Sequence, residues 1–141
     1  MTKAPSLDNA AIDLIRDSFV QVLFARDEAA RIFYAHLFAI APETRALFRD
    51  DLTEQGRVLI ATLASIVAGL NRLEESAPTI RALGQRHVAY GVLPSHYPAV
   101  GAALLHMVTV TGGGTLHPAT EVAWRTAYRT IAALMIGEPD A

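Results

Sequence analysis

The chain has no cysteine among its 141 residues. Disulfide bonds, thiolate metal sites and thioether attachment of a cofactor are therefore excluded, because each of them needs a thiol. Any cofactor of this protein must be held non-covalently or through His, Tyr, Met or carboxylate side chains.

Charged residues are also scarce, at 18% of the chain, and the formal net charge is −2 without any run of Lys or Arg. The chain therefore has too few clustered basic side chains to form a surface that binds the phosphates of a nucleic acid. The richest apolar stretch, from Val58 to Leu70, is shorter than the roughly 18 residues that a membrane-spanning helix needs. Charged side chains interrupt the first twenty residues, which argues against a signal peptide. We expect a cytoplasmic protein without a nucleic-acid or membrane partner.

Apolar residues, in contrast, are abundant and make up 52% of the chain. A chain of this length fits one domain, residues 1–141, and such a domain buries about two thirds of the surface that its unfolded chain exposes. The apolar share exceeds that of an average soluble domain. An apolar cofactor pocket would account for the surplus.

Apolar residues recur at steps of three and four along most of the chain, which indicates helices with one buried face. No alternating strand pattern of useful length is present, so the fold class is all-α, with six main helices and one short one. The expected helices run from a cap at Ser6, Asp8 or Asn9 to about Ala25, from after Asp27 to Ala41, from Pro42 to near Phe48, from Leu52 to about Leu73, from near Pro78 to Gly91, from about Ser95 to Gly112, and onward from Pro118.

One of the five histidines stands out by its neighbours. His87 shares a predicted helical face with Ile80, Leu83 and Gly91, which are apolar or lack a side chain. A neutral imidazole there needs a partner on each ring nitrogen, and a metal ion on one side with a protein acceptor on the other meets that need. His87 is therefore the candidate metal ligand. The histidines to which we assign no role are His36, His106 and His117.

Two segments carry a resemblance to a known family. The segments from Leu83 to Val92 and from Ser95 to Gly101 are similar to the proximal region of bacterial single-domain haemoglobins and of the globin domain of flavohaemoglobins. The likeness extends through residues 33–38, 42–48 and 123–128. It implies a three-over-three helical sandwich, the globin fold, with haem b held between the long fourth helix and the helix of His87.

On the proximal side, the resemblance makes His87 the iron ligand and Phe48 an aromatic that packs on the haem, although Phe48 is equally well explained as core. Tyr97 matches a tyrosine that, together with a glutamate, hydrogen-bonds the proximal histidine in these globins. The glutamate position falls on Pro139, with Glu138 one residue earlier. One residue on a helix is about 100° of rotation, so the sequence departs from the family here.

On the distal side, the resemblance places Tyr34 where its hydroxyl donates a hydrogen bond to a diatomic ligand, with a core tyrosine as the alternative. Gln55 matches the distal position that myoglobin fills with histidine. Leu59 follows one helical turn later on the same face. Without the resemblance, Gln55 near a helix start is more often a solvated residue.

The function that the resemblance implies is reversible binding of O2 and conversion of NO with O2 to nitrate, with CO as a further ligand. The chain ends at Ala141, so we expect an external reductase, and a monomer or homodimer. Two alternatives stay open. One is a ligand sensor or an oxygen storage and delivery module without turnover. The other is a haem-free regulatory bundle, against which the apolar surroundings of His87 argue.

Overall fold

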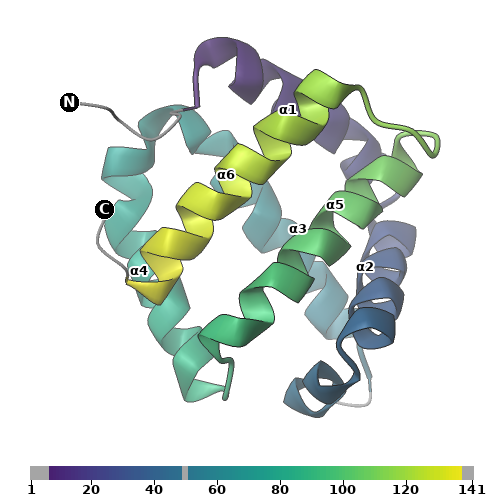
Figure 1. Cartoon of the computed structure of the whole chain (residues 1–141), viewed down its shortest axis with the longest axis vertical. Helices are drawn as coiled ribbons and strands as arrows, with labels where there is room; N and C mark the ends of the chain where they lie inside the picture. Colours follow the sequence, from purple (N-terminus) through teal and green to yellow (C-terminus); the bar gives the residue numbers. More distant parts are fainter. Residues whose placement is uncertain (1–6, 49–50, 138–141) are drawn as a thin grey trace.

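The computed structural model describes residues 7–48 and 51–137, and within these ranges the protein is built of helices without strands (Figure 1). The all-α prediction is therefore confirmed. The elements in chain order are α1 (Asn9–Phe24), α2 (Arg26–Ile40), the 3-10 helix η1 (Pro42–Leu47), α3 (Thr53–Ala68), η2 (Leu70–Arg72), α4 (Leu73–Ala89), η3 (Pro94–His96), α5 (Tyr97–Thr111) and α6 (Pro118–Ile136).

The first helix shows how the local sequence sets an element. Asp8 is its N-cap, and the carboxylate accepts a hydrogen bond of 2.8 Å from the Ala11 N–H. This satisfies one of the backbone donors that a helix start leaves free. The predicted apolar face is confirmed, because the buried residues of α1 are Ile12, Ile15, Phe19 and Val22.

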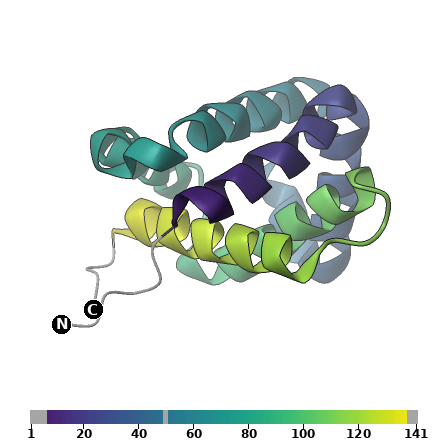
Figure 2. The same ribbon diagram turned by 90° about the horizontal axis from the view of Figure 1, so that it is seen from above.

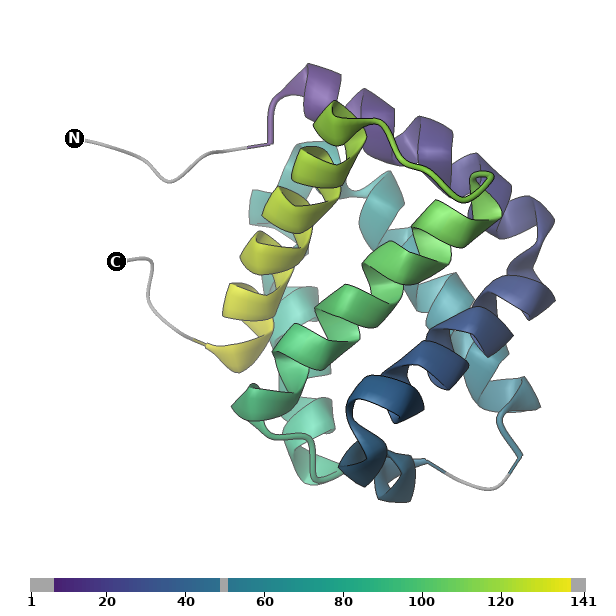
Figure 3. The same cartoon turned by 45° about the vertical axis from the view of Figure 1, so that its right-hand side comes forward.

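The helices lie in two layers. Seen from above, α5 and α6 form one side of the molecule, and α3 with α4 lie on the opposite side (Figure 2). Helix α2 packs along α5, as Figure 3 shows, while α4 and α1 both pack on α6. Helices α2 and α3 approach closely at Gly56, where a Cβ would come within 2.9 Å of the Ala30 Cβ.

The boundary between the fourth and fifth predicted helices was wrong. Helix α3 ends at Ala68, and α4 begins at Leu73, five residues before Pro78. Glu74 and Glu75 occupy the first turn of α4, where carboxylates interact favourably with the helix dipole. Pro78 therefore lies inside α4 and leaves one backbone carbonyl without its usual intrahelical donor.

The end of α4 is a Schellman motif. Its last helical residue is Ala89, so Gly91 lies beyond the helix instead of on its face, contrary to our prediction. Gly91 has φ +96°, a conformation that strongly favours glycine. The Val92 N–H donates to the His87 carbonyl at 3.0 Å, and the Gly91 N–H donates to the Val88 carbonyl at 3.0 Å. This pair of bonds fixes the backbone around His87.

Within the described residues, no single helix has both the length and the apolar composition needed to cross a membrane. One bent pair, Thr53–Ala68 with Leu70–Ala89, meets the length and composition criteria when the two helices are taken together, with a bend of 55° between them.

Candidate functional site

The imidazole of His87 is oriented by its own helix. His87 is half-buried in the last turn of α4, and its Nδ1 lies 2.8 Å from the carbonyl oxygen of Leu83. Since a carbonyl can only accept, Nδ1 carries the proton and donates it. The Nε2 lone pair is then left for another partner. A metal ion is the partner that a neutral imidazole with this tautomer suits best.

Tyr34 lies in an aromatic cluster between α2 and η1. Its side chain is 5% exposed, and its ring centroid lies 5.1 Å from that of Phe33 and 5.2 Å from that of Phe48. Burial raises the pKa of the Tyr34 hydroxyl to about 12. The hydroxyl therefore keeps its proton and remains a hydrogen-bond donor. In the described part of the chain it makes no hydrogen bond.

Gln55 has a buried polar atom, Oε1, that lacks a hydrogen-bond partner within the described ranges. Among the described residues, no other buried side-chain oxygen or nitrogen lacks a partner. Leaving such an atom unpaired costs about 1–3 kcal/mol. The solvated interpretation of Gln55 is therefore wrong for this atom. Leu59, one turn further along α3, is half-buried and packs against the hydrophobic core.

Phe48 and Tyr34 are brought together, although thirteen residues separate them in the sequence. The Phe48 ring centroid also lies 5.7 Å from that of Phe38, and the Arg45 guanidinium lies over the Phe38 ring, 5.2 Å from its centroid. Phe48 is partly buried and packs against the core. Its position is compatible with both predictions made for it, a core residue and a wall of the cofactor site.

Tyr97 opens α5 and is 9% exposed, and burial raises the pKa of its hydroxyl. Its backbone carbonyl accepts a hydrogen bond of 2.7 Å from the Tyr128 hydroxyl. In the described ranges, no hydrogen bond joins Tyr97 to His87. Glu138 and Pro139 lie outside the described residues. The described partner of the His87 ring is thus a backbone carbonyl.

A hollow of about 290 Å³ lies between α3 and α4. Arg86, one of the residues that line it, directly precedes His87 in the sequence. Ile80 and Leu83 give it an apolar wall. Its polar lining, which our sequence reasoning missed, comes from Thr62, Ser65, Thr79 and Arg86. Helical spacing was the available signal for Thr62 alone, which lies three residues after Leu59 and so on the same face of α3.

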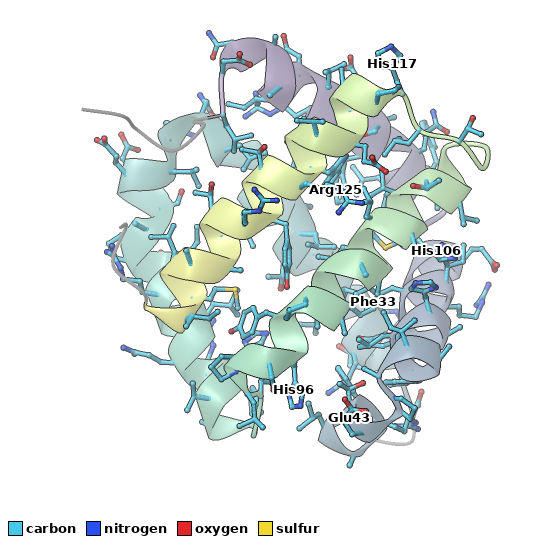
Figure 4. All side chains as sticks on the ribbon, viewed as in Figure 1. Phe33, Glu43, His96, His106, His117 and Arg125 are labelled. Atoms are coloured by element: carbon cyan, nitrogen blue, oxygen red, sulfur yellow. The ribbon has the colours of Figure 1, made fainter. Side chains whose placement is uncertain are left out.

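The other histidines have structural settings away from His87. His96 accepts the Leu93 N–H at 3.0 Å, and His117 caps α6 by accepting the Ala119 N–H at 3.1 Å. The rings of His36 and His106 stack at 4.1 Å between centroids. Figure 4 shows the labelled histidines at separate places: His96 lies in η3, His106 on α5 and His117 at the start of α6. His117 thus stands at the entry of α6, directly before Pro118.

The comparisons with known proteins agree with this geometry. The Globin family model matches residues 31–135, most of the chain. The chain belongs to the globin family. Over 76% of the length of this globin, its sequence is 34% identical to the flavohemoprotein of Deinococcus radiodurans. Over 93% of the length of this globin, it is 31% identical to the flavohemoprotein of Bacillus subtilis. It spans 27% and 34% of these two relatives, so about a third of their length.

Solved structures confirm the globin fold. A bacterial globin from Campylobacter jejuni superposes with a TM-score of 0.80 at 26% identity, covering 92% of this globin and 94% of the other chain. Ferric myoglobin from Aplysia limacina superposes with a TM-score of 0.82, covering 94% and 98%, but at 16% identity it shows the fold alone. The predicted three-over-three sandwich is therefore confirmed.

Globins are haem-binding proteins, and the residues of this globin fit the group. In a globin a histidine would hold the haem iron, and the Nε2 of His87 has no hydrogen-bond partner among the described residues. The buried Gln55 Oε1 without a partner lies on α3, across from α4. No group of three or more His, Asp or Glu side chains within the described residues is arranged to hold a free metal ion. A single imidazole would suit an iron ion that takes its other protein-independent ligands from a macrocycle.

Proposed function

We propose that this globin is a single cytoplasmic domain that binds haem b between α3 and α4, binds O2 reversibly, and converts NO with O2 to nitrate. When bound, haem supplies the iron at which O2 and NO react. The observation that carries the proposal is the His87 ring, whose Nδ1–H donates to the Leu83 carbonyl at 2.8 Å and leaves Nε2 free.

One imidazole and several apolar side chains hold the cofactor in this proposal. His87 is the metal ligand, and the backbone bonds on its ring and on its carbonyl reduce the number of rotamers that it must give up on binding. Phe48 and Leu59 supply apolar walls, and Tyr97 packs on the proximal side. Arg86, which lines the hollow, would offer a cation to a haem carboxylate.

The distal residues orient the gaseous ligand. Tyr34 donates a hydrogen bond from a hydroxyl that burial keeps protonated, and the Gln55 amide acts beside it on the distal side of the haem. An amide can rotate so that its NH2 group, instead of Oε1, points at an acceptor. Both side chains thus hold O2 in place while NO approaches, and neither is a strong iron ligand that would block the site.

Turnover also needs an electron donor, because the iron must return to the ferrous state after NO conversion. We propose an external reductase as the partner. CO, which binds ferrous iron but is not converted, serves as a third ligand in assays. A monomer or a homodimer is compatible with this function.

The test is an absorption spectrum of the purified globin loaded with haem, followed by addition of NO to its O2 form. We expect a Soret band, a stable O2 spectrum, and rapid decay with one nitrate formed per NO consumed. Absence of haem binding would overturn the proposal as a whole. Slow decay without nitrate would overturn the NO-converting step alone.

One observation favours storage or delivery of O2, without turnover, as the second candidate. The described partner of the His87 ring is the neutral Leu83 carbonyl, which makes the imidazole less anionic than a carboxylate partner would. A less anionic ligand gives the iron less electron density for oxidation chemistry. Nitrate formed over many turnovers with an added electron donor distinguishes the two candidates, because a storage protein that is not reduced again converts at most one NO per chain.

A further inference from the structure

Helix α4 meets the last turn of α6 at Gly84. Gly84 is buried, and a Cβ placed on it would collide with the carbonyl oxygen of Met135 and lie 2.5 Å from its carbonyl carbon and 2.6 Å from its Cα. These are backbone atoms of α6, so they cannot rotate away as a side chain can. Carbon atoms in contact are normally about 3.5–4.0 Å apart. Any side chain at residue 84 would therefore separate the two helices by about 1 Å or more at this point.

The same residue belongs to the peptide group that orients His87. The carbonyl that accepts the His87 Nδ1–H at 2.8 Å is that of Leu83, and this carbonyl is part of the peptide bond between Leu83 and Gly84. His87 itself follows three residues later, about 4.5 Å further along the helix axis. A displacement of α4 at Gly84 consequently moves both the imidazole and its hydrogen-bond acceptor.

We propose that Gly84 is a positioning residue for the iron ligand. Its missing Cβ lets α4 lie directly on the backbone of Met135, and this contact fixes the distance of the His87 imidazole from the haem plane. Gly84 touches neither iron nor haem in this scheme; it acts through His87. The inference rests on the proposed function, because it needs His87 to be the ligand.

The test compares Gly84→Ala with Gly56→Ala in the haem-loaded protein. Gly56 is a matched control, since its Cβ would also collide at a helix crossing, 2.9 Å from the Ala30 Cβ, but between α2 and α3. The readouts are the ferrous iron–histidine stretching band and the rate of haem transfer to an acceptor protein. For Gly84→Ala we expect a lowered or broadened band and haem loss about tenfold faster, while Gly56→Ala leaves the band unchanged.

A second background separates positioning from general destabilisation. In His87→Gly with added imidazole, the axial ligand is no longer attached to α4, so Gly84→Ala should change the rate of haem loss less than about twofold. An equally large effect in both backgrounds would overturn the inference and make Gly84 a purely structural residue. An unchanged band in Gly84→Ala would overturn it as well.

Met135→Gly keeps the inference testable if Gly84→Ala does not fold. A glycine in the last turn weakens the helix, which loosens the contact from the α6 side without adding an atom. We expect a broadened iron–histidine band, and an unchanged band would contradict the inference. A wild-type protein that binds haem without any iron–histidine band would instead overturn the assignment of His87, and with it the proposed function.

Discussion

The proximal and distal residues differ in whether their polar groups have hydrogen-bond partners. On α4, the His87 ring and the His87 carbonyl both have backbone partners, at 2.8 Å and 3.0 Å. On the opposite side, the Gln55 Oε1 is buried without a partner, and the Tyr34 hydroxyl makes no hydrogen bond within the described residues. The proximal side is thus arranged by the fold alone. The distal side has a buried acceptor, the Gln55 Oε1, that has no partner among the described residues.

Removing the His87 imidazole should have the largest effect, because it takes away the polar group that defines the proximal side. We expect His87→Ala to lose haem or to bind it at least about 100-fold more weakly, because even the loss of a partner of a metal ligand costs about 10–100-fold. Added imidazole should restore binding. Haem transfer to an acceptor protein measures the effect, and His36→Ala is the control. Normal haem retention in His87→Ala would reject the ligand assignment.

Removing the distal hydroxyl should have the next largest effect. In Tyr34→Phe we expect O2 to dissociate about tenfold faster, because a hydrogen bond to a charged acceptor contributes about 1.5–3 kcal/mol. Stopped-flow displacement of O2 by CO measures the rate. Since burial raises the Tyr34 pKa to about 12, the wild-type rate should stay slow at pH 10, where an exposed tyrosine is half ionised.

An unchanged dissociation rate in Tyr34→Phe would mean that Gln55 alone supplies the distal hydrogen bond. The double variant with Gln55→Leu decides this, because it removes both donors. If the double variant also keeps the wild-type rate, neither side chain contacts the ligand.

Removing the unpaired distal amide should stabilise the empty protein. For Gln55→Leu we expect the free energy of unfolding of the haem-free globin to rise by about 1 kcal/mol, since an unsatisfied buried oxygen is replaced by apolar atoms. Urea denaturation measures the change. Gln21→Leu, at an exposed position of α1, is the matched control and should stay within about 0.5 kcal/mol of wild type. A destabilised Gln55→Leu would show that the amide has a partner after all.

The smallest effect is expected on the proximal side, where the backbone already satisfies His87. Tyr97→Phe and Glu138→Gln should leave the ferrous iron–histidine stretching band close to its wild-type position. Resonance Raman spectra of the deoxygenated protein provide the measurement. A band that falls in both variants would show that Tyr97 and Glu138 make the imidazole more anionic, and would remove the contrast between the two sides.

Much of the fold was predictable because its signals are local. The α1 cap at Asp8, the apolar period of α1 and the start of α6 at Pro118 depend on residues within one or two turns. The boundary between α3 and α4 was missed because Pro78 suggested a helix start. The stronger signals were Gly69, which caps α3 with bonds to the Ser65 and Ile66 carbonyls, and the acidic first turn of α4.

The candidate site was predictable to the extent that its residues have distinct chemistry. His87 stood out as an imidazole on an apolar face, and family resemblance supplied Tyr34 and Gln55. Arg86 and Thr79 were missed, because an arginine or a threonine on an amphipathic helix is ordinary, and nothing in the sequence says that a hollow lies beside it.

The sequence by itself determined the all-α class and the Asp8 cap of α1. The orientation of the His87 ring is also local, because the Leu83 carbonyl that accepts its proton lies one turn away in the same helix. The tertiary structure decided which polar groups have no partner and where helices can touch. The burial of the Gln55 oxygen depends on several elements packing around it. The need for glycine at residue 84 exists because the end of α6, fifty residues later, passes over it. Such contacts join distant segments, and no local pattern encodes them.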